Sequence, residues 1–115
     1  MKANPLIVDF MEQEDNKLCF DCGGKPANWV SVNNSIFLCL NCSGNHRGLG
    51  VNVSYIKSIV LDKWNENQTK MLLSGGNARL ADLLESFEVP AETEFKVLYT
   101  SQLLNFYRKL VSFSI

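Results

Sequence analysis

Four cysteines in the first half of the chain form two Cys-x-x-Cys pairs with sixteen residues between them: Cys19, Cys22, Cys39 and Cys42. Each pair can place two thiolates on one metal ion, and two pairs complete the tetrahedron of a four-cysteine zinc site. Four thiolates leave no open coordination position. We therefore predict one structural Zn²⁺ that holds the fold and takes no part in chemistry.

Three other uses of cysteine are less compatible with this pattern: a redox motif, disulfides, and free cysteines buried in the core as two separate pairs. A single Cys-x-x-Cys would leave a thioredoxin-like redox motif open, but two pairs of equal spacing favour a metal. Disulfides are disfavoured because the N-terminus, MKANPLIVDFMEQEDNK, does not have the pattern of a secretory signal. No stretch approaches the ~20 apolar residues of a membrane span. We expect a cytoplasmic protein.

Arginine is scarce in this chain, and one arginine follows the second cysteine pair closely. The net charge is −1 and the arginines are Arg47, Arg79 and Arg108, which gives no basic footprint for nucleic acid. On a helix that begins at the second pair, Arg47 points roughly 110° away from the mean direction of the two cysteines. Its base would be fixed by the metal knuckle and its tip free, which suits insertion into another protein's active site. A surface salt bridge or a contact to a helix-end carbonyl is the alternative.

The elements that must position these residues follow from caps, turns and periodicity. Asn4 and Pro5 predict the start of a short helix, and the glycines after Arg47 predict the end of another. Strands are expected from β-branched runs on either side of a polar turn. The expected elements before Trp64 are a helix from Pro5, a hairpin of Trp29–Val32 and Ile36–Leu38, a helix from Leu40 to about Arg47, and a strand at Tyr55–Leu61.

The second half of the chain is predicted to be helical. One helix ends at Gly75 and Gly76, and the next begins with Asn77 as its cap and ends before Pro90. Two apolar stripes are expected to face the core: Leu80, Leu83, Leu84 and Phe87, and Leu103, Phe106, Tyr107 and Leu110. Trp64 is interpreted as a packing anchor. Length, 46% hydrophobic content and the absence of a linker predict a single domain over residues 1–115.

The chain resembles the catalytic domain of Arf GTPase-activating proteins (ArfGAPs). The motif that carries the resemblance is C-x2-C-x16-C-x2-C-x4-R, ending at Arg47, and the segments CFDCGGKPANWVSV, FLCLNCSGNHRGLGV and SYIKSIVLDKW surround it. The resemblance extends from about Asn16 to Leu110. One departure is visible, because the family usually has a histidine where this chain has Asn52.

The resemblance implies an α+β fold, in which a small three-stranded sheet with a four-cysteine zinc finger is surrounded by about five helices. It also implies that Arg47 acts as a catalytic arginine finger on an Arf-family small GTPase. GTP and Mg²⁺ would belong to that partner, so the chain would be an activator and not itself an enzyme. A role in vesicle trafficking, peripheral placement at Golgi membranes and a monomeric state are expected with it, and nucleic acid is not an expected partner.

Further residues receive roles by their match to family positions or by their place in the sequence. His46, the only histidine, is interpreted as a packing or hydrogen-bonding residue that orients the arginine helix. Trp29 and Ile36 match positions near the surface that faces the GTPase, with hairpin core as the alternative. Lys57 and Asp62 are candidate polar contacts on the same side. Two competing functions stay open: a zinc-finger binding module, and a catalytically silent GTPase-binding scaffold.

Overall fold

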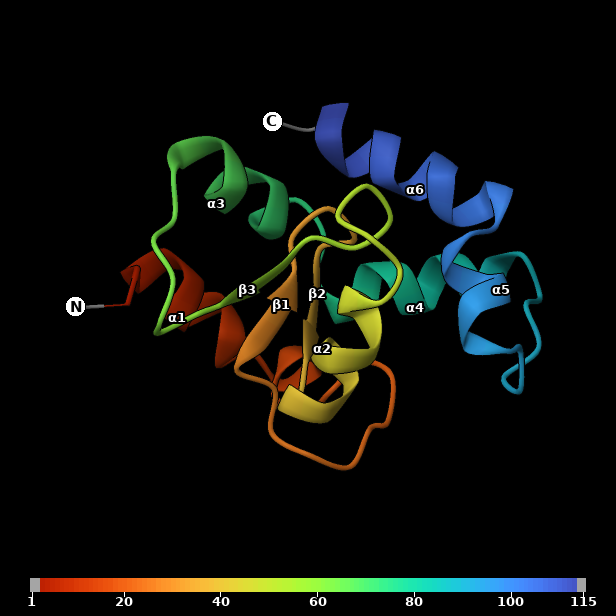
Figure 1. Ribbon diagram of the computed structural model, residues 1–115, viewed down its shortest axis with the longest axis horizontal. Helices are drawn as coiled ribbons and strands as arrows, with labels where there is room; N and C mark the ends of the chain where they lie inside the picture. Colours follow the sequence, from red (N-terminus) through yellow and green to blue (C-terminus); the bar gives the residue numbers. More distant parts are fainter. Residues whose placement is uncertain (1–2, 114–115) are drawn as a thin grey trace.

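The computed structural model describes residues 3–113, and Figure 1 shows its elements around a small central sheet. The α+β architecture expected from the sequence is confirmed. The elements in chain order are α1 (Pro5–Met11), the 3-10 helix η1 (Glu14–Asn16), β1 (Trp29–Ser31), β2 (Ile36–Leu38), α2 (Leu40–Arg47), β3 (Ile56–Ser58), α3 (Glu66–Leu73), α4 (Asn77–Ser86), α5 (Phe95–Tyr99) and α6 (Gln102–Phe113). Within the described range, no helix has the length and apolar character that crossing a membrane requires.

The sheet is antiparallel and has the order β2-β1-β3. Val30 in the central strand lies opposite Phe37 on one side and Lys57 on the other. Alternate residues of a strand face opposite sides of a sheet. Trp29 and Ser31 therefore share one face of β1, and Val30 lies on the other.

Two hydrophobic cores lie on the two faces of this sheet. Ile36 and Leu38 of β2 pack with residues of α4, α5 and α6 in the first core, whereas Val30 and Phe37 pack with residues of α1 and α3 in the second. In Figure 1, α1 and α3 lie to the left of the strands, α4 and α5 lie to the right, and α2 crosses in front. Trp64 packs against the second core, as its predicted role as an anchor requires.

The third strand is shorter than the predicted Tyr55–Leu61, because a turn follows directly after Ser58. The hydroxyl of Ser58 accepts hydrogen bonds from the backbone N–H groups of Val60 and Leu61. The carboxylate of Asp62 accepts one from the N–H of Ser58 at 2.7 Å. Val60 and Leu61 are consequently exposed, and their β-branched and apolar character does not extend the strand.

Asn77 is not the cap of α4, which corrects the sequence prediction. Gly76, with φ of +99°, precedes the helix, and Asn77 is its first residue. The buried Asn77 side chain accepts a hydrogen bond from the N–H of Phe37 and donates one to the carbonyl of Leu18. It joins the start of α4 to the sheet and to the segment before the first cysteine pair.

The apolar stripes of the later helices are partly different from those predicted. The buried residues of α6 are Leu104, Tyr107 and Val111, whereas Phe106 is 52% exposed. Phe87, expected on the core face of α4, is 61% exposed. The short helix α5 was not predicted, because its five residues are too few to show a helical period.

Gly75 gives a prediction about stability that is independent of function. A Cβ at this position would lie 2.7 Å from the hydroxyl of Tyr107 and closer still to the side chain of Ser35. We expect Gly75→Ala to lower the free energy of unfolding by about 1–3 kcal/mol through overpacking, measured by urea denaturation. The matched control is Gly44→Ala inside α2, where a Cβ meets no atom within 4 Å and a small gain from helix propensity is expected. Equal effects of the two substitutions would contradict the packing described here.

Candidate functional site

The four cysteines gather at one end of the hairpin from two separate segments. Cys19 and Cys22 lie in the loop after η1, where the N–H of Gly23, at φ of +68°, donates to the carbonyl of Cys19 at 2.8 Å. Cys39 follows β2 and caps α2, with its Sγ accepting the N–H of Cys42. Strand pairing thus brings the second pair next to the first.

The spacing of the sulfur atoms fits a bound metal ion. The four Sγ atoms lie within 4.8 Å of one another, and those of Cys22 and Cys39 are 3.9 Å apart. A tetrahedral Zn²⁺ with Zn–S distances of ~2.3 Å holds its sulfurs about 3.8 Å apart, whereas a disulfide needs about 2.05 Å. All four cysteines are free thiols. Among the described residues this is the one such cluster of potential metal ligands.

The protonation of these thiols couples metal binding to protons. Burial raises the pKa of the Cys19 and Cys42 thiols above the ordinary value, so both are neutral in the metal-free protein near pH 7. The exposed Cys22 differs, because a hydrogen bond from the backbone of Gly24 lowers its pKa to about 7. Metal ligation requires thiolates, and binding of an ion would therefore release protons from Cys19 and Cys42.

Arg47 is exposed at the last residue of α2. The Cζ atom of its guanidinium lies 5.5 Å from the centroid of the Trp29 ring, in a cation–π arrangement. Within residues 3–113, the ion pairs do not include Arg47. The alternative of a surface salt bridge is therefore not supported for this arginine, and its charged tip faces solvent.

His46, the residue before Arg47, is fully buried and points about 100° away from it around the helix. Its Nε2 lies 2.6 Å from a carboxylate oxygen of Asp21, and its Nδ1 lies 2.7 Å from the hydroxyl of Ser54. The rings of Phe95 and Tyr99 from α5 contact it edge to face, with centroids 5.0 and 4.4 Å away. His46 is hydrogen-bonded at both nitrogens and enclosed by two aromatic rings.

The contacts of His46 belong to a longer chain of hydrogen bonds that crosses the sheet face. The hydroxyl of Ser54 lies 2.7 Å from that of Ser31 in β1. Ser31 accepts from the amide of Asn34 at 2.8 Å, and Asn34 accepts in turn from Arg108 of α6 at 2.9 Å. We call this series of residues the buried chain: Arg108, Asn34, Ser31, Ser54, His46 and Asp21.

Every donor of the buried chain has an acceptor if the hydrogen bonds run in one direction. Because Ser31 accepts from Asn34, its own proton is available to Ser54, whose proton then goes to Nδ1 of His46. His46 in its Nε2–H tautomer donates to Asp21, as also does the hydroxyl of Tyr99. Burial, followed by the charge of Asp21, raises the pKa of Tyr99 well above its ordinary value, so its hydroxyl remains a donor.

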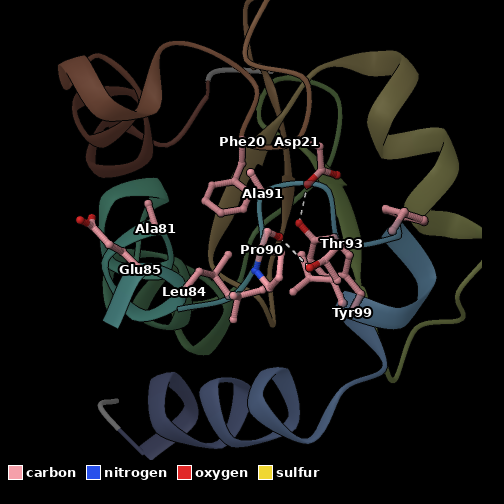
Figure 2. Close-up of a pocket in the computed structure, with 12 residues that line it drawn as sticks. Phe20, Asp21, Ala81, Leu84, Glu85, Pro90, Ala91, Thr93 and Tyr99 are labelled. Carbon is pink, nitrogen blue, oxygen red and sulfur yellow. Dashed lines mark hydrogen bonds between the residues drawn. The ribbon is translucent and has the colours of Figure 1, made fainter. Parts of the chain in front are cut away.

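One end of the buried chain borders a cavity of about 560 Å³. Figure 2 shows Asp21 and Tyr99 at one end of this cavity, and Ala81 and Glu85 of α4 at the other. The side chain of Asp21 is 17% exposed. The carboxylate is one end at which the buried chain reaches solvent, and the partly exposed Arg108 is the other.

The four residues predicted to contact a partner lie in different environments. Trp29 is partly buried beneath Arg47, and the ammonium of Lys57 lies over the rings of Tyr55 and Trp64 at 5.7 and 5.6 Å. Ile36 has no exposed surface, which fits the alternative of hairpin core and leaves no atom for a partner to touch. Asp62 holds the turn after β3.

The sequence analysis did not identify the partners of His46. Asp21 lies between two predicted metal ligands, and a carboxylate there could have been noted as a group that does not bind the metal. Ser54, Tyr99 and Arg108 gave no signal, because they are 8, 53 and 62 positions from His46 in the sequence. The loop before β3 brings Ser54 to His46 and α5 brings Tyr99, whereas Arg108 of α6 is connected to His46 only through Asn34, Ser31 and Ser54.

Comparisons with known proteins agree on one family. The family model described as "Putative GTPase activating protein for Arf" matches residues 4–109. ADP-ribosylation factor GTPase-activating protein 3 of Rattus norvegicus is 38% identical over 97 residues, which are 84% of this chain and 18% of that protein. Stromal membrane-associated protein 1 of Homo sapiens is 41% identical over 90 residues, which are 74% of this chain and 19% of that protein.

A solved structure shares most of the fold. The crystal structure titled "putative GTPase activating protein for ADP ribosylation factor from Cryptosporidium parvum" superposes with a TM-score of 0.85 and 29% identity, over 92% of this chain and 85% of that one. The chain spans less than half the length of the curated relatives that it matches.

Proposed function

Because this chain belongs to the ArfGAP family, the GTPase-activating proteins for Arf, we propose that it stimulates GTP hydrolysis by an Arf-family small GTPase through Arg47. One observation carries the assignment of this residue. Arg47 ends a helix that is capped by Cys39 and has Cys42 in its first turn, and its guanidinium is exposed without an ion-pair partner in the described part of the chain. An arginine held in this way is available to another protein.

The proposed reaction takes place in the nucleotide site of the partner. During phosphoryl transfer from GTP to water, negative charge spreads over the oxygens of the transferred group. A guanidinium supplied in trans stabilises that charge, and arginine fingers in GTPases are worth ~10³ to 10⁵ in rate. The planar fork of Arg47 can donate two parallel hydrogen bonds, which the point charge of a lysine cannot.

Zinc has a structural role in this proposal. Cys19, Cys22, Cys39 and Cys42 would hold it and, because four thiolates fill its coordination sphere, it would supply charge neutralisation and a rigid junction between the knuckles. The chain's own residues do the rest. Cys39 and Cys42 fix the start of α2, and Trp29 supports the guanidinium until the partner binds.

The partner surface is proposed to surround Arg47 and to include Trp29 and Lys57. Both retain partly exposed side chains, but Lys57 pairs with Val30 and therefore lies on the opposite face of the sheet from Trp29. A partner seated on Arg47 would reach Lys57 across the edge strand β3. Asp62 contributes indirectly by holding the turn that exposes Val60 and Leu61. Ile36 is left out of this surface because it is fully buried.

The test of this function is GTP turnover by a panel of small GTPases with and without the zinc-loaded chain. Stimulation of Arf-family members and of no Ras- or Rho-type GTPase is expected. Tight binding to an Arf-family GTPase without faster hydrolysis would favour the silent scaffold. A DNA mobility-shift assay at low salt, in which we expect no binding, addresses the alternative of a nucleic-acid module.

A further inference from the structure

The helix that carries Arg47 has almost no apolar anchor of its own. Its sequence, Leu40-Asn-Cys-Ser-Gly-Asn-His-Arg47, contains one large aliphatic residue, Leu40, which is 63% exposed. The buried residues of the helix are Ser43 and His46, both polar. Packing of an apolar face normally fixes how a helix is rotated and tilted on its neighbours. In α2 other contacts must do so.

Two anchors, one at each end, take the place of apolar packing in α2. The cysteine cluster holds the first turn through Cys39 and Cys42. Four residues after Cys42, His46 holds the last turn through Asp21 and Ser54. A helix held only at its first turn can still rotate and fray at its end. The second anchor is therefore the one that decides where Arg47 points.

The side chains of Arg47 and His46 both connect to the same face of β1, Arg47 directly and His46 through Ser54. The guanidinium of Arg47 lies over Trp29, while the contacts of His46 lead through Ser54 to Ser31. Trp29 and Ser31 are two positions apart on one strand and share a face. Any rotation of α2 that broke the His46 contacts would move Arg47 off Trp29 as well.

We propose that His46 is a positioning residue, which acts through the buried chain to hold the guanidinium of Arg47 in the orientation that a GTPase receives. The proposal rests on the proposed function of Arg47. His46 touches no reacting group itself, since it is fully buried. The rings of Phe95 and Tyr99 and the hydrogen bonds at both nitrogens leave its imidazole one orientation.

The experiment compares two serine-to-alanine variants. Ser54→Ala removes the hydroxyl that contacts Nδ1 of His46 and lies outside α2. Ser43→Ala removes a buried hydroxyl within α2 that donates to the carbonyl of Leu40 and is not in the buried chain. We expect kcat for GTP hydrolysis on an Arf-family GTPase to fall about tenfold in Ser54→Ala, with KM unchanged, and to stay within about twofold in Ser43→Ala.

His46→Phe extends the test by removing both hydrogen bonds at nearly constant ring size. A misplacement of about 1 Å can cost ~10²-fold in rate, and we expect a fall of that order in kcat. His46→Gln, which can still donate toward Asp21, should recover part of it. Zinc content and thermal unfolding of each variant show whether it is folded. If His46→Phe is destabilised, the comparison of Ser54→Ala with Ser43→Ala tests the proposal by itself.

A second measurement does not depend on GTPase activity. The ring current of Trp29 shifts the NMR signals of the Arg47 side chain, and there are only three arginines to assign. We expect these signals to move toward random-coil values in Ser54→Ala and His46→Phe, and to stay in place in Ser43→Ala. Unchanged Arg47 signals, or equal kcat in the two serine variants, would overturn the proposal. If the wild-type chain stimulates no GTPase, the proposed function fails, and the NMR comparison still decides whether His46 orients Arg47.

Discussion

The Arg47→Lys variant is expected to fold, to bind zinc and to lose at least about 100-fold of its stimulation of GTP hydrolysis on an Arf-family GTPase. Arg47→Ala is expected to lose about 10³-fold or more, the range of arginine fingers in other GTPases. Lysine keeps the charge but not the planar pair of donors, so the loss in Arg47→Lys measures the contribution of the planar guanidinium. Single-turnover hydrolysis with excess activator gives both rates.

Arg79→Lys is the matched control for this prediction. Arg79 donates to the carbonyl of Ser74 at the end of α3, and nothing places it near Arg47. We expect its variant to stimulate hydrolysis as the wild type does. Circular dichroism and zinc content verify folding in each case. A folded, zinc-loaded Arg47→Lys protein with undiminished stimulation would end the assignment of Arg47 as the finger.

Removal of zinc is expected to unfold the protein. Structural zinc sites contribute about 10–16 kcal/mol of apparent binding free energy near pH 7, and a small domain is stable by only about 5–15 kcal/mol in total. The free energy of zinc binding is therefore about as large as the total free energy of unfolding. Cys19 and Cys39 also lie in the first core, so loss of the ion would disturb the packing there. We expect chelation under reducing conditions to abolish helical circular dichroism and cooperative melting.

Reversibility separates the loss of the ion from damage to the thiols. Added Zn²⁺ should restore the helical signal, whereas Mg²⁺, which prefers oxygen ligands, should not. Cys22→Ser gives a genetic counterpart, since it removes the exposed ligand without changing the core. A metal-free protein, verified by elemental analysis, that keeps its full helical signal would show that the four thiols do not hold the fold together.

The parts of the fold that the sequence predicted are those set by local signals. The cap at Asn4 and Pro5, the hairpin, and the helix ending at Arg47 depend on neighbouring residues, and they lie where they were expected. The cysteine cluster depends on two short spacings and one hairpin. The pairing of β1 with β2 brings these spacings together.

The parts that the sequence did not predict depend on contacts between distant segments. Asparagine is a common helix cap, but the side chain of Asn77 instead accepts a hydrogen bond from the N–H of Phe37, forty positions away. The strand at Ile56 stops early because Ser58 and Asp62 form a turn that competes with the strand pattern. Phe106 and Phe87 fit an apolar stripe, but α6 and α4 turn other residues to the core.

In the candidate site too, the sequence predicts the residues with local signals but not those that meet through contacts between distant segments. The sequence predicted the four cysteines as one cluster, and the structure brings them together, because their spacing is local and their chemistry is specific. Arg47 stays a prediction that rests on its position after the second pair. The sequence assigned His46 an orienting role but could not name Asp21, Ser54 or Tyr99, which contact it from other segments of the chain. The sequence could not decide whether Ile36 faces the core or a partner, since an isoleucine in a strand is compatible with either face of the sheet.

The central claim is that the guanidinium of Arg47 enters the nucleotide site of an Arf-family GTPase as GTP is hydrolysed. GDP with aluminium fluoride and Mg²⁺ mimics the transferring phosphoryl group, so the most direct measurement is the affinity of the chain for an Arf-family GTPase in that state, by calorimetry. We predict tight binding of the wild type only when aluminium fluoride is present, and loss of that increment in a folded Arg47→Ala variant. An increment of equal size in both proteins would contradict the account.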